Sequence, residues 1–135
     1  MQALVDKLHE GGYSCVIANG GELRTYSQHG VADLMGLLRG PDAKFLRGAS
    51  VADKVIGKAA AVLMLLGGVR EVYGDVMSNT ALEFLKGKPV KVSFGERVPH
   101  IHNASRTGWC PMDSLIRSES DADKMLEMLE EFLSY

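Results

Sequence analysis

The sequence has little cysteine, one tryptophan and no excess of charge of either sign. Its 135 residues include 2 cysteines and 1 tryptophan, and the formal net charge is -2. Cys15 and Cys110 lie far apart and form neither a disulfide framework nor a CxxC pair. The sequence also has no stripe rich in lysine and arginine, so we expect no nucleic-acid partner.

Long hydrophobic runs are also missing. The longest apolar run, residues 59–66, is far shorter than the roughly 20 residues of a membrane-spanning helix, so we expect no membrane partner. The first residues lack a basic segment followed by a long apolar one, and we expect no signal peptide. Together with the scarcity of cysteine, this favours a cytoplasmic protein.

The composition is that of an ordinary folded protein. Hydrophobic residues make up 46% of the chain and charged residues 24%. A chain of this length can build one hydrophobic core without disulfides or metals. We therefore expect a single domain over residues 1–135.

Glycine and proline divide the chain into short segments with alternating helix and strand patterns. A helix ending at residues 11–12 precedes a hairpin with strands over 13–18 and 22–27, and a helix over 31–38 follows. The rest of the chain predicts strands over 45–52, 69–77 and 90–94, helices over 53–66, 79–86 and 115–135, and irregular structure over 96–113. Strands joined by helices run parallel, and the hairpin adds an antiparallel edge. We predict a three-layer α/β/α fold with a mixed sheet of about five strands.

The first candidate site lies where the expected helices begin after their strands, because ligands of such sheets bind there. Asp53 is expected to cap the helix over 53–66, and Lys54 and Lys58 fall in its first turn. Lysine opposes the helix dipole at this position, whereas a bound anion would relieve the conflict. Gly57 leaves room for a ligand. In the alternative interpretation both lysines simply extend into solvent.

The next expected helix begins at Ser78, Asn79 and Thr80, which supply polar groups. If the two preceding strands are neighbours, the two helix starts face one crevice. The sequence therefore predicts a small anionic ligand, held by Lys54 and Lys58 and by these three residues.

The loop over residues 99–111 is the second candidate region, because long loops within compact domains are usually functional or disordered. His100, His102 and Cys110 form an incomplete metal-ligand set without a fourth ligand, so we expect no metal. Cys110 is either a small apolar residue or a reactive thiol. In the second case it would be a nucleophile, with Lys54 or Asp53 as its acid/base partner.

Two strings carry a resemblance, DKVIGKAAA at residues 53–61 and TGWCPMD at residues 107–113. With Ser78 and Ala81 they resemble a small prokaryotic family of unknown function that is assigned to the cytidine deaminase-like superfamily. The resemblance implies a cytidine deaminase-like fold. It also implies Asn103 and Arg106 as ligand-binding residues, although two residues separate them here and the family has them adjacent.

The zinc ligands and the general-acid/base glutamate of zinc deaminases are missing. The corresponding positions hold Asp53 and residues 78–80, so the resemblance does not imply a zinc deaminase. Other proteins of this fold carry out metal-free chemistry at the same crevice. We expect no cofactor, and we expect a homodimer, both from the apolar run over 59–66 and from the oligomeric habit of the superfamily.

Three hypotheses follow for the function. The first is a metal-free domain that binds a small anionic, nucleotide-like molecule, which Asp53 would contact at its base or ribose. The second is a metal-free enzyme that uses Cys110. The third is a regulatory or interaction subunit with apolar helices that cover a partner.

Overall fold

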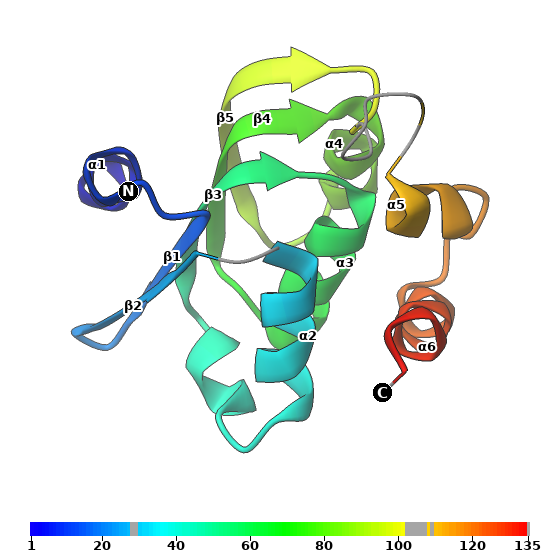
Figure 1. Cartoon of the computed structure of the whole chain (residues 1–135), viewed down its shortest axis with the longest axis horizontal. Coiled ribbons are helices and arrows are strands. Elements are labelled where there is room, and N and C mark those ends of the chain that lie inside the picture. Colours follow the sequence, from blue (N-terminus) through cyan, green and yellow to red (C-terminus); the bar gives the residue numbers. More distant parts are fainter. Residues whose placement is uncertain (28–29, 102–107, 109, 135) are drawn as a thin grey trace.

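Figure 1 shows a computed structural model of the chain, which describes residues 1–27, 30–101, 108 and 110–134. Helices and strands alternate along most of the chain, as the glycine and proline pattern predicts. The elements are α1 (Gln2–Gly11), β1 (Cys15–Asn19), β2 (Glu22–Tyr26), α2 (Gly30–Arg39), the 3-10 helix η1 (Ala43–Leu46), β3 (Ser50–Ile56), α3 (Lys58–Gly67), β4 (Glu71–Ser78), α4 (Asn79–Leu85), β5 (Lys91–Val98), α5 (Pro111–Leu115) and α6 (Ala122–Leu133).

The strands form one mixed sheet in the order β2-β1-β3-β4-β5. Strand β1 is antiparallel to both of its neighbours, β2 and β3, whereas β3, β4 and β5 run parallel. The predicted α/β fold with a mixed sheet of about five strands is therefore confirmed.

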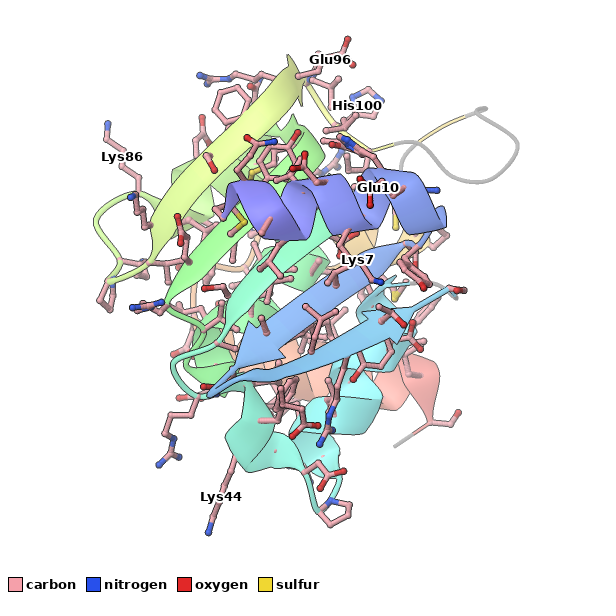
Figure 2. The ribbon with its side chains drawn as sticks, turned by 90° about the vertical axis from the view of Figure 1, so that its left-hand side faces the viewer. Lys7, Glu10, Lys44, Lys86, Glu96 and His100 are labelled. Atoms are coloured by element: carbon pink, nitrogen blue, oxygen red, sulfur yellow. The ribbon has the colours of Figure 1, made fainter. Side chains whose placement is uncertain are left out.

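The helices cover the two faces of the sheet unequally. Helix α1 packs over β1 and β3 on one face, and Figure 2 shows it lying across the strands. On the other face α3 lies between α2 and α4, and α5 and α6 pack outside α3 (Figure 1). The predicted three layers are present, and α5 and α6 add a further layer beyond α3.

Helix α3 is the centre of the larger core. Residues 59–64 are all buried, which accounts for the lack of a polar face in this part of the sequence. The chain's own sheet and helices α2, α4 and α6 provide the surfaces that cover it. The helix ends at Gly67, and its C-cap Gly68 has a φ of 82°, which glycine readily adopts.

The prediction was wrong about the boundary between β3 and α3. The strand was expected over 45–52, but residues 43–46 form η1 and the strand extends from Ser50 to Ile56. Helix α3 begins at Lys58 with Gly57 as its N-cap, so Asp53 does not cap it. The β-branched residues Val55 and Ile56 favour the strand at this point.

Two further boundaries differ from the expectation at the end of the chain. Strand β5 continues to Val98 instead of ending near residue 94. A short helix, α5, forms at Pro111–Leu115, mostly within the stretch expected to be irregular, and the helix expected over 115–135 begins only at Ala122. Asp121 caps α6 there by accepting hydrogen bonds from the backbone N–H groups of Asp123 and Lys124 at 2.9 and 3.2 Å.

Candidate functional site

A carboxylate of the chain itself occupies the N-terminus of α3. Asp113, on α5, is 3% exposed, and its Oδ1 accepts a hydrogen bond of 2.9 Å from the backbone N–H of Ala59. Burial raises the pKa of Asp113, whereas this bond, the N–H of Lys58 and the charge of Lys58 lower it. A Cβ atom at Gly57 would lie 2.1 Å from Asp113 Oδ2, so this glycine makes room for Asp113.

Lys58, the first residue of α3, forms hydrogen bonds with the segment that follows α5. Its Nζ donates to the backbone carbonyls of Ile116, Arg117 and Glu119 at 3.0, 3.3 and 2.7 Å. An ammonium group has three donors, so these bonds use all of them. Burial lowers the pKa of Lys58, and the nearby carboxylates of Glu119 and Asp113 oppose that shift.

We call this pair of contacts the α3–α5 clasp, formed by Lys58 and Asp113. The sequence predicts a bound anion at the N-terminus of α3, and in the structure the Asp113 carboxylate lies at that position. The geometry leaves Lys58 no donor for a ligand. Lys54 lies on β3 with an exposed side chain, so the two lysines do not share a helical turn.

Ser78, Asn79 and Thr80, which the sequence predicts to bind a ligand, form hydrogen bonds with other groups of the protein. Ser78 caps α4 by accepting from the N–H of Ala81 at 3.1 Å, and its Oγ lies 2.9 Å from Thr80 Oγ1. Asn79 Oδ1 accepts a hydrogen bond from Arg97 Nε. Thr80 also lies with Lys58 along a pocket of ≈ 300 Å³, so the structure does bring these two predicted residues together. The other lining residues of this pocket are Glu83, Phe84, Lys88, Arg117, Glu119 and Ser120.

The loop over 99–111 is described only in part. Cys110 is half-buried at the N-cap of α5, and its N–H donates to the carbonyl of Ile101 at 2.8 Å. His100 lies just beyond the end of β5 (Figure 2). His102, Asn103 and Arg106 lie outside the described residues. Among the described residues, no group of three or more His, Cys, Asp or Glu side chains is arranged to hold a metal ion.

Asp53 has the most unusual environment of the predicted residues. It sits within β3, directly opposite Cys15 of β1, and is 3% exposed. Its Oδ1 accepts a hydrogen bond of 3.2 Å from the N–H of Val55. Its Oδ2 is buried and has no hydrogen-bond partner in the described part of the chain. A buried polar atom without a partner is rare in native structures.

Burial raises the pKa of Asp53 to about 7. The N–H groups of Val55 and Lys54 and the Cys15 thiol act in the opposite direction, and the charge of Asp33 adds to the increase. Burial also raises the pKa of Cys15 well above its ordinary value, with further contributions from Asp53 and Asp33. A thiol in these surroundings is not activated as a nucleophile.

Asp33 connects this buried group to an open pocket. It lies in the first turn of α2 and lines a pocket of ≈ 520 Å³ between β2 and α2. Asp53 does not itself line the pocket, but the Asp33 charge acts on Asp53, on Cys15 and on Tyr26. The remaining lining residues are Arg24, Tyr26, Ala32, Gly36, Leu37, Gly40, Pro41 and Asp42. We call Cys15, Tyr26, Asp33 and Asp53 the Asp53 cluster.

Sequence reasoning identified Asp53 but missed the other members of the Asp53 cluster. Cys15, Tyr26 and Asp33 come from three different elements, and no motif links them to residue 53. The available signals were weak: an acidic residue inside an apolar segment that continues as a strand, and a lone cysteine inside another strand.

Comparison with known proteins identifies the family. The model of the family described as TM1506, domain of unknown function (DUF1893), matches residues 3–133. The chain belongs to this family. A crystal structure of a DUF1893 family protein (TM1506) from Thermotoga maritima has a TM-score of 0.84 and 21% sequence identity, and the match covers 97% of this chain and 88% of that one. A comparison with curated proteins finds no match.

These findings confirm the resemblance to a family of unknown function and the α/β fold. A similarity at 21% identity shows the fold alone, so placement in the cytidine deaminase-like superfamily stays a prediction. None of the described helices of this DUF1893 chain is long and apolar enough to cross a membrane.

The clasp predicts opposite outcomes for the two lysines of the DKVIGK string. Lys58→Gln should lower the free energy of unfolding by about 1–3 kcal/mol, because it leaves carbonyls near the end of α5 without their donor. Lys54→Gln, at an exposed position, should change it by less than about 0.5 kcal/mol. Urea unfolding of both variants measures the difference. Equal stability of the two variants would show that Lys58 does not hold α5.

Proposed function

We propose that this DUF1893 domain is a metal-free small-molecule-binding protein and that its ligand enters the pocket between β2 and α2. Asp33 would contact the ligand at the pocket wall, and Asp53 would be the buried group that completes its recognition. The observation that carries the proposal is the Oδ2 atom of Asp53, buried without a hydrogen-bond partner in the described residues.

The physical argument is the free energy of that atom. Burying a polar group without a partner costs about 1–3 kcal/mol, and more when the group is charged. The second carboxylate, Asp33, raises the cost of charging Asp53 further. A perturbed acid is a typical feature of functional sites, and Asp33, whose charge acts on Asp53, lines the pocket. A ligand that donates a hydrogen bond here would remove the penalty.

The nucleotide-like ligand expected from the sequence is compatible with this site. A nucleobase carries N–H donors that suit a carboxylate acceptor, in agreement with the expected contact between Asp53 and a base or ribose. The anionic part of such a molecule would not suit the pocket between β2 and α2, because Asp33 and Asp42 both line it.

A second pocket favours an anionic ligand. Three cations, Lys58, Lys88 and Arg117, line the ≈ 300 Å³ pocket together with the hydroxyl of Thr80, although Glu83 and Glu119 line it as well. We propose this pocket, rather than the exposed Lys54, as the site for a phosphate group. Lys88 would contribute its charge, whereas Lys58 would keep the clasp in place.

The other hypotheses remain proposals with changed support. An enzyme that uses Cys110 as nucleophile and Lys54 or Asp53 as acid/base partner gains no geometric support, because Cys15 is the thiol beside Asp53.

The order of helix, hairpin and alternating helices and strands supports a cytidine deaminase-like fold. A cytoplasmic location stays a prediction that rests on the small number of cysteines.

The proposed binding site predicts a ligand-dependent gain in thermal stability. In a screen of nucleosides, nucleotides and other small metabolites, a ligand at about 100 times its Kd should stabilise the protein by about 2.7 kcal/mol. Asp53→Asn should abolish this gain, whereas Asp6→Asn, an exposed substitution on α1, should leave it unchanged. If no compound stabilises the protein, or if the Asp53 variant keeps the full gain, the proposed function is wrong.

The raised pKa of Asp53 predicts an unusual dependence of stability on pH. Between about pH 4 and 7 the folded protein holds a proton on Asp53 that the unfolded chain has lost. The contribution of Asp53 to the free energy of unfolding should therefore fall as pH rises through this window, by up to about 4 kcal/mol, and level off above it. Asp53→Asn should remove this decline and be more stable than the wild type at pH 8. Urea unfolding across the window tests both points.

A homodimer stays a prediction, but the apolar run over 59–66 no longer supports it, because α3 is covered within the chain. The superfamily resemblance still supports it, and the structure adds an exposed apolar surface, with Leu115 and Phe132 41% and 51% exposed. Light scattering at high micromolar concentration should give twice the chain mass, and Phe132→Ser should shift the mass toward that of one chain. A monomer mass for the wild type would contradict the prediction.

A further inference from the structure

Strand β5 forms an open edge of the sheet. It pairs with β4 on one side, and no strand of the described chain pairs with its other side. The strand has 8 residues, against 5 for β2 at the opposite edge. Residues 91 and 93–97 are exposed, so no described helix or loop covers them. A long exposed edge is a surface to which the strand of a partner can pair.

The backbone of β5 offers hydrogen-bonding groups at this edge. The N–H of Lys91 donates to the carbonyl of Arg70 at 2.9 Å, so the backbone groups of Lys91 point toward β4. Pairing with β4 is continuous over residues 91–94, and successive residues of a strand direct their backbone groups to opposite sides. Val92 and Phe94 therefore direct theirs away from β4. An added strand can bond to both residues without disturbing the bonds between β4 and β5.

A groove of ≈ 580 Å³ lies between α4 and β5. Leu82 and Leu85 of α4 line it together with Val90 and Val92 on the side of β5. The remaining lining residues are Glu83, Lys86, Gly87, Lys88 and Arg97. Val92 belongs to both features, because its backbone faces the open edge and its side chain lines the groove. A strand that pairs with β5 therefore directs the side chains of one face toward the groove.

Cations outnumber acids along this groove. Lys86, Lys88 and Arg97 line it, with Glu83 as the one acidic residue among the described lining residues. Lys86 is exposed, and Figure 2 shows its side chain extending away from the molecule. Arg97 Nε donates to the side-chain amide oxygen of Asn79, a neutral group that leaves the positive charge in place. The groove therefore suits a partner that carries negative charge.

We infer that the edge of β5 and this groove bind an extended acidic peptide segment of another protein, which adds to the five-stranded sheet as a further strand. The peptide backbone bonds to Val92 and Phe94. Its apolar side chains pack on Leu82 and Val92, and its acidic side chains lie near Lys86 and Arg97. This interaction is independent of the small-molecule binding proposed above, because it uses a different edge of the sheet.

A second copy of the chain suits this edge less well. A two-fold contact places a surface against the same surface of the partner, so two basic grooves would meet. Lys91, whose side chain is 81% exposed, and Arg97 also lie on the strand itself. Charged side chains on an edge strand discourage pairing between copies. The positive charge of the groove therefore favours an acidic segment over a second copy.

Three peptides with the same length test the inference: acetyl-Thr-Glu-Thr-Val-Thr-Glu-Thr-amide and two versions with both glutamates replaced by glutamine or by lysine. When the peptide is extended, its valine and both glutamates share one face. NMR titration of the full chain should give a Kd for the acidic peptide roughly three- to tenfold below that for the glutamine peptide, and no binding of the lysine peptide. Amide hydrogen exchange at Val92 and Phe94 should slow with the acidic peptide, because their N–H groups gain acceptors.

Matched variants separate the backbone contact from the charge contact. Phe94→Pro removes the N–H that faces the open edge and should raise the Kd for the acidic peptide roughly tenfold, whereas Phe94→Ala keeps this N–H and should raise it less. Lys86→Gln should raise the Kd by roughly threefold. Lys44→Gln removes the same charge at an exposed position in η1, away from the groove (Figure 2), and should have no effect. Urea unfolding checks that each variant is folded, and if Phe94→Pro is not, hydrogen exchange in the wild type decides the backbone contact.

Several results would overturn the inference. It is wrong if none of the peptides binds at millimolar concentration, if the three bind equally, or if Lys44→Gln weakens binding as much as Lys86→Gln. It is also wrong if the acidic peptide binds without slowing exchange at Val92 and Phe94, because no strand is then added. If exchange at these residues is already slow without peptide and Phe94→Pro converts a dimer to a monomer, a second copy occupies the edge instead. The thermal screen of nucleosides and metabolites decides the proposed function separately.

Discussion

The architecture depends on how the N-terminus of the buried helix α3 is satisfied. Several elements pack against α3, so its first turn cannot rely on water for its free N–H groups. Asp113 accepts from the N–H of Ala59, and Lys58 returns the contact by donating to three carbonyls after α5. The clasp thereby connects the central helix to the C-terminal layer, and Gly57 makes it possible because a side chain there would collide with Asp113.

Two buried aspartates have contrasting surroundings in this protein. Burial raises the pKa of both Asp113 and Asp53. Asp113 is surrounded by backbone donors and a lysine, which stabilise its ionised form and make it a helix cap. Asp53 faces a thiol and another acid, and one of its oxygens is unpartnered in the described chain. The same residue type therefore strengthens the fold at one position and weakens it at the other, and the weaker position is the candidate site.

Local patterns predicted the elements well and their boundaries less well. The hairpin at residues 19–21, the parallel strands and the apolar central helix all follow from turn residues and hydrophobic periodicity. The segment over 53–57 was misread because aspartate before an apolar run is a common helix start, whereas Val55 and Ile56 also fit a strand. Pairing with β1 and β4 decided between the two, because it supplies hydrogen bonds to the backbone of β3. Such pairing is a long-range interaction that a local window does not contain.

The sequence by itself determined the α/β class, the order of the elements and the importance of the DKVIGK string. It also predicted an anionic group at the N-terminus of α3, although as a bound ligand. Only the tertiary structure decided that this anion is Asp113, 55 positions beyond Lys58 in the chain, and that Asp53 lies beside Cys15 and acts together with Asp33. The physical reason is that charge and burial act through space. The partner that satisfies or destabilises an ionisable group is set by the packing of distant elements, and nothing in the local sequence specifies it.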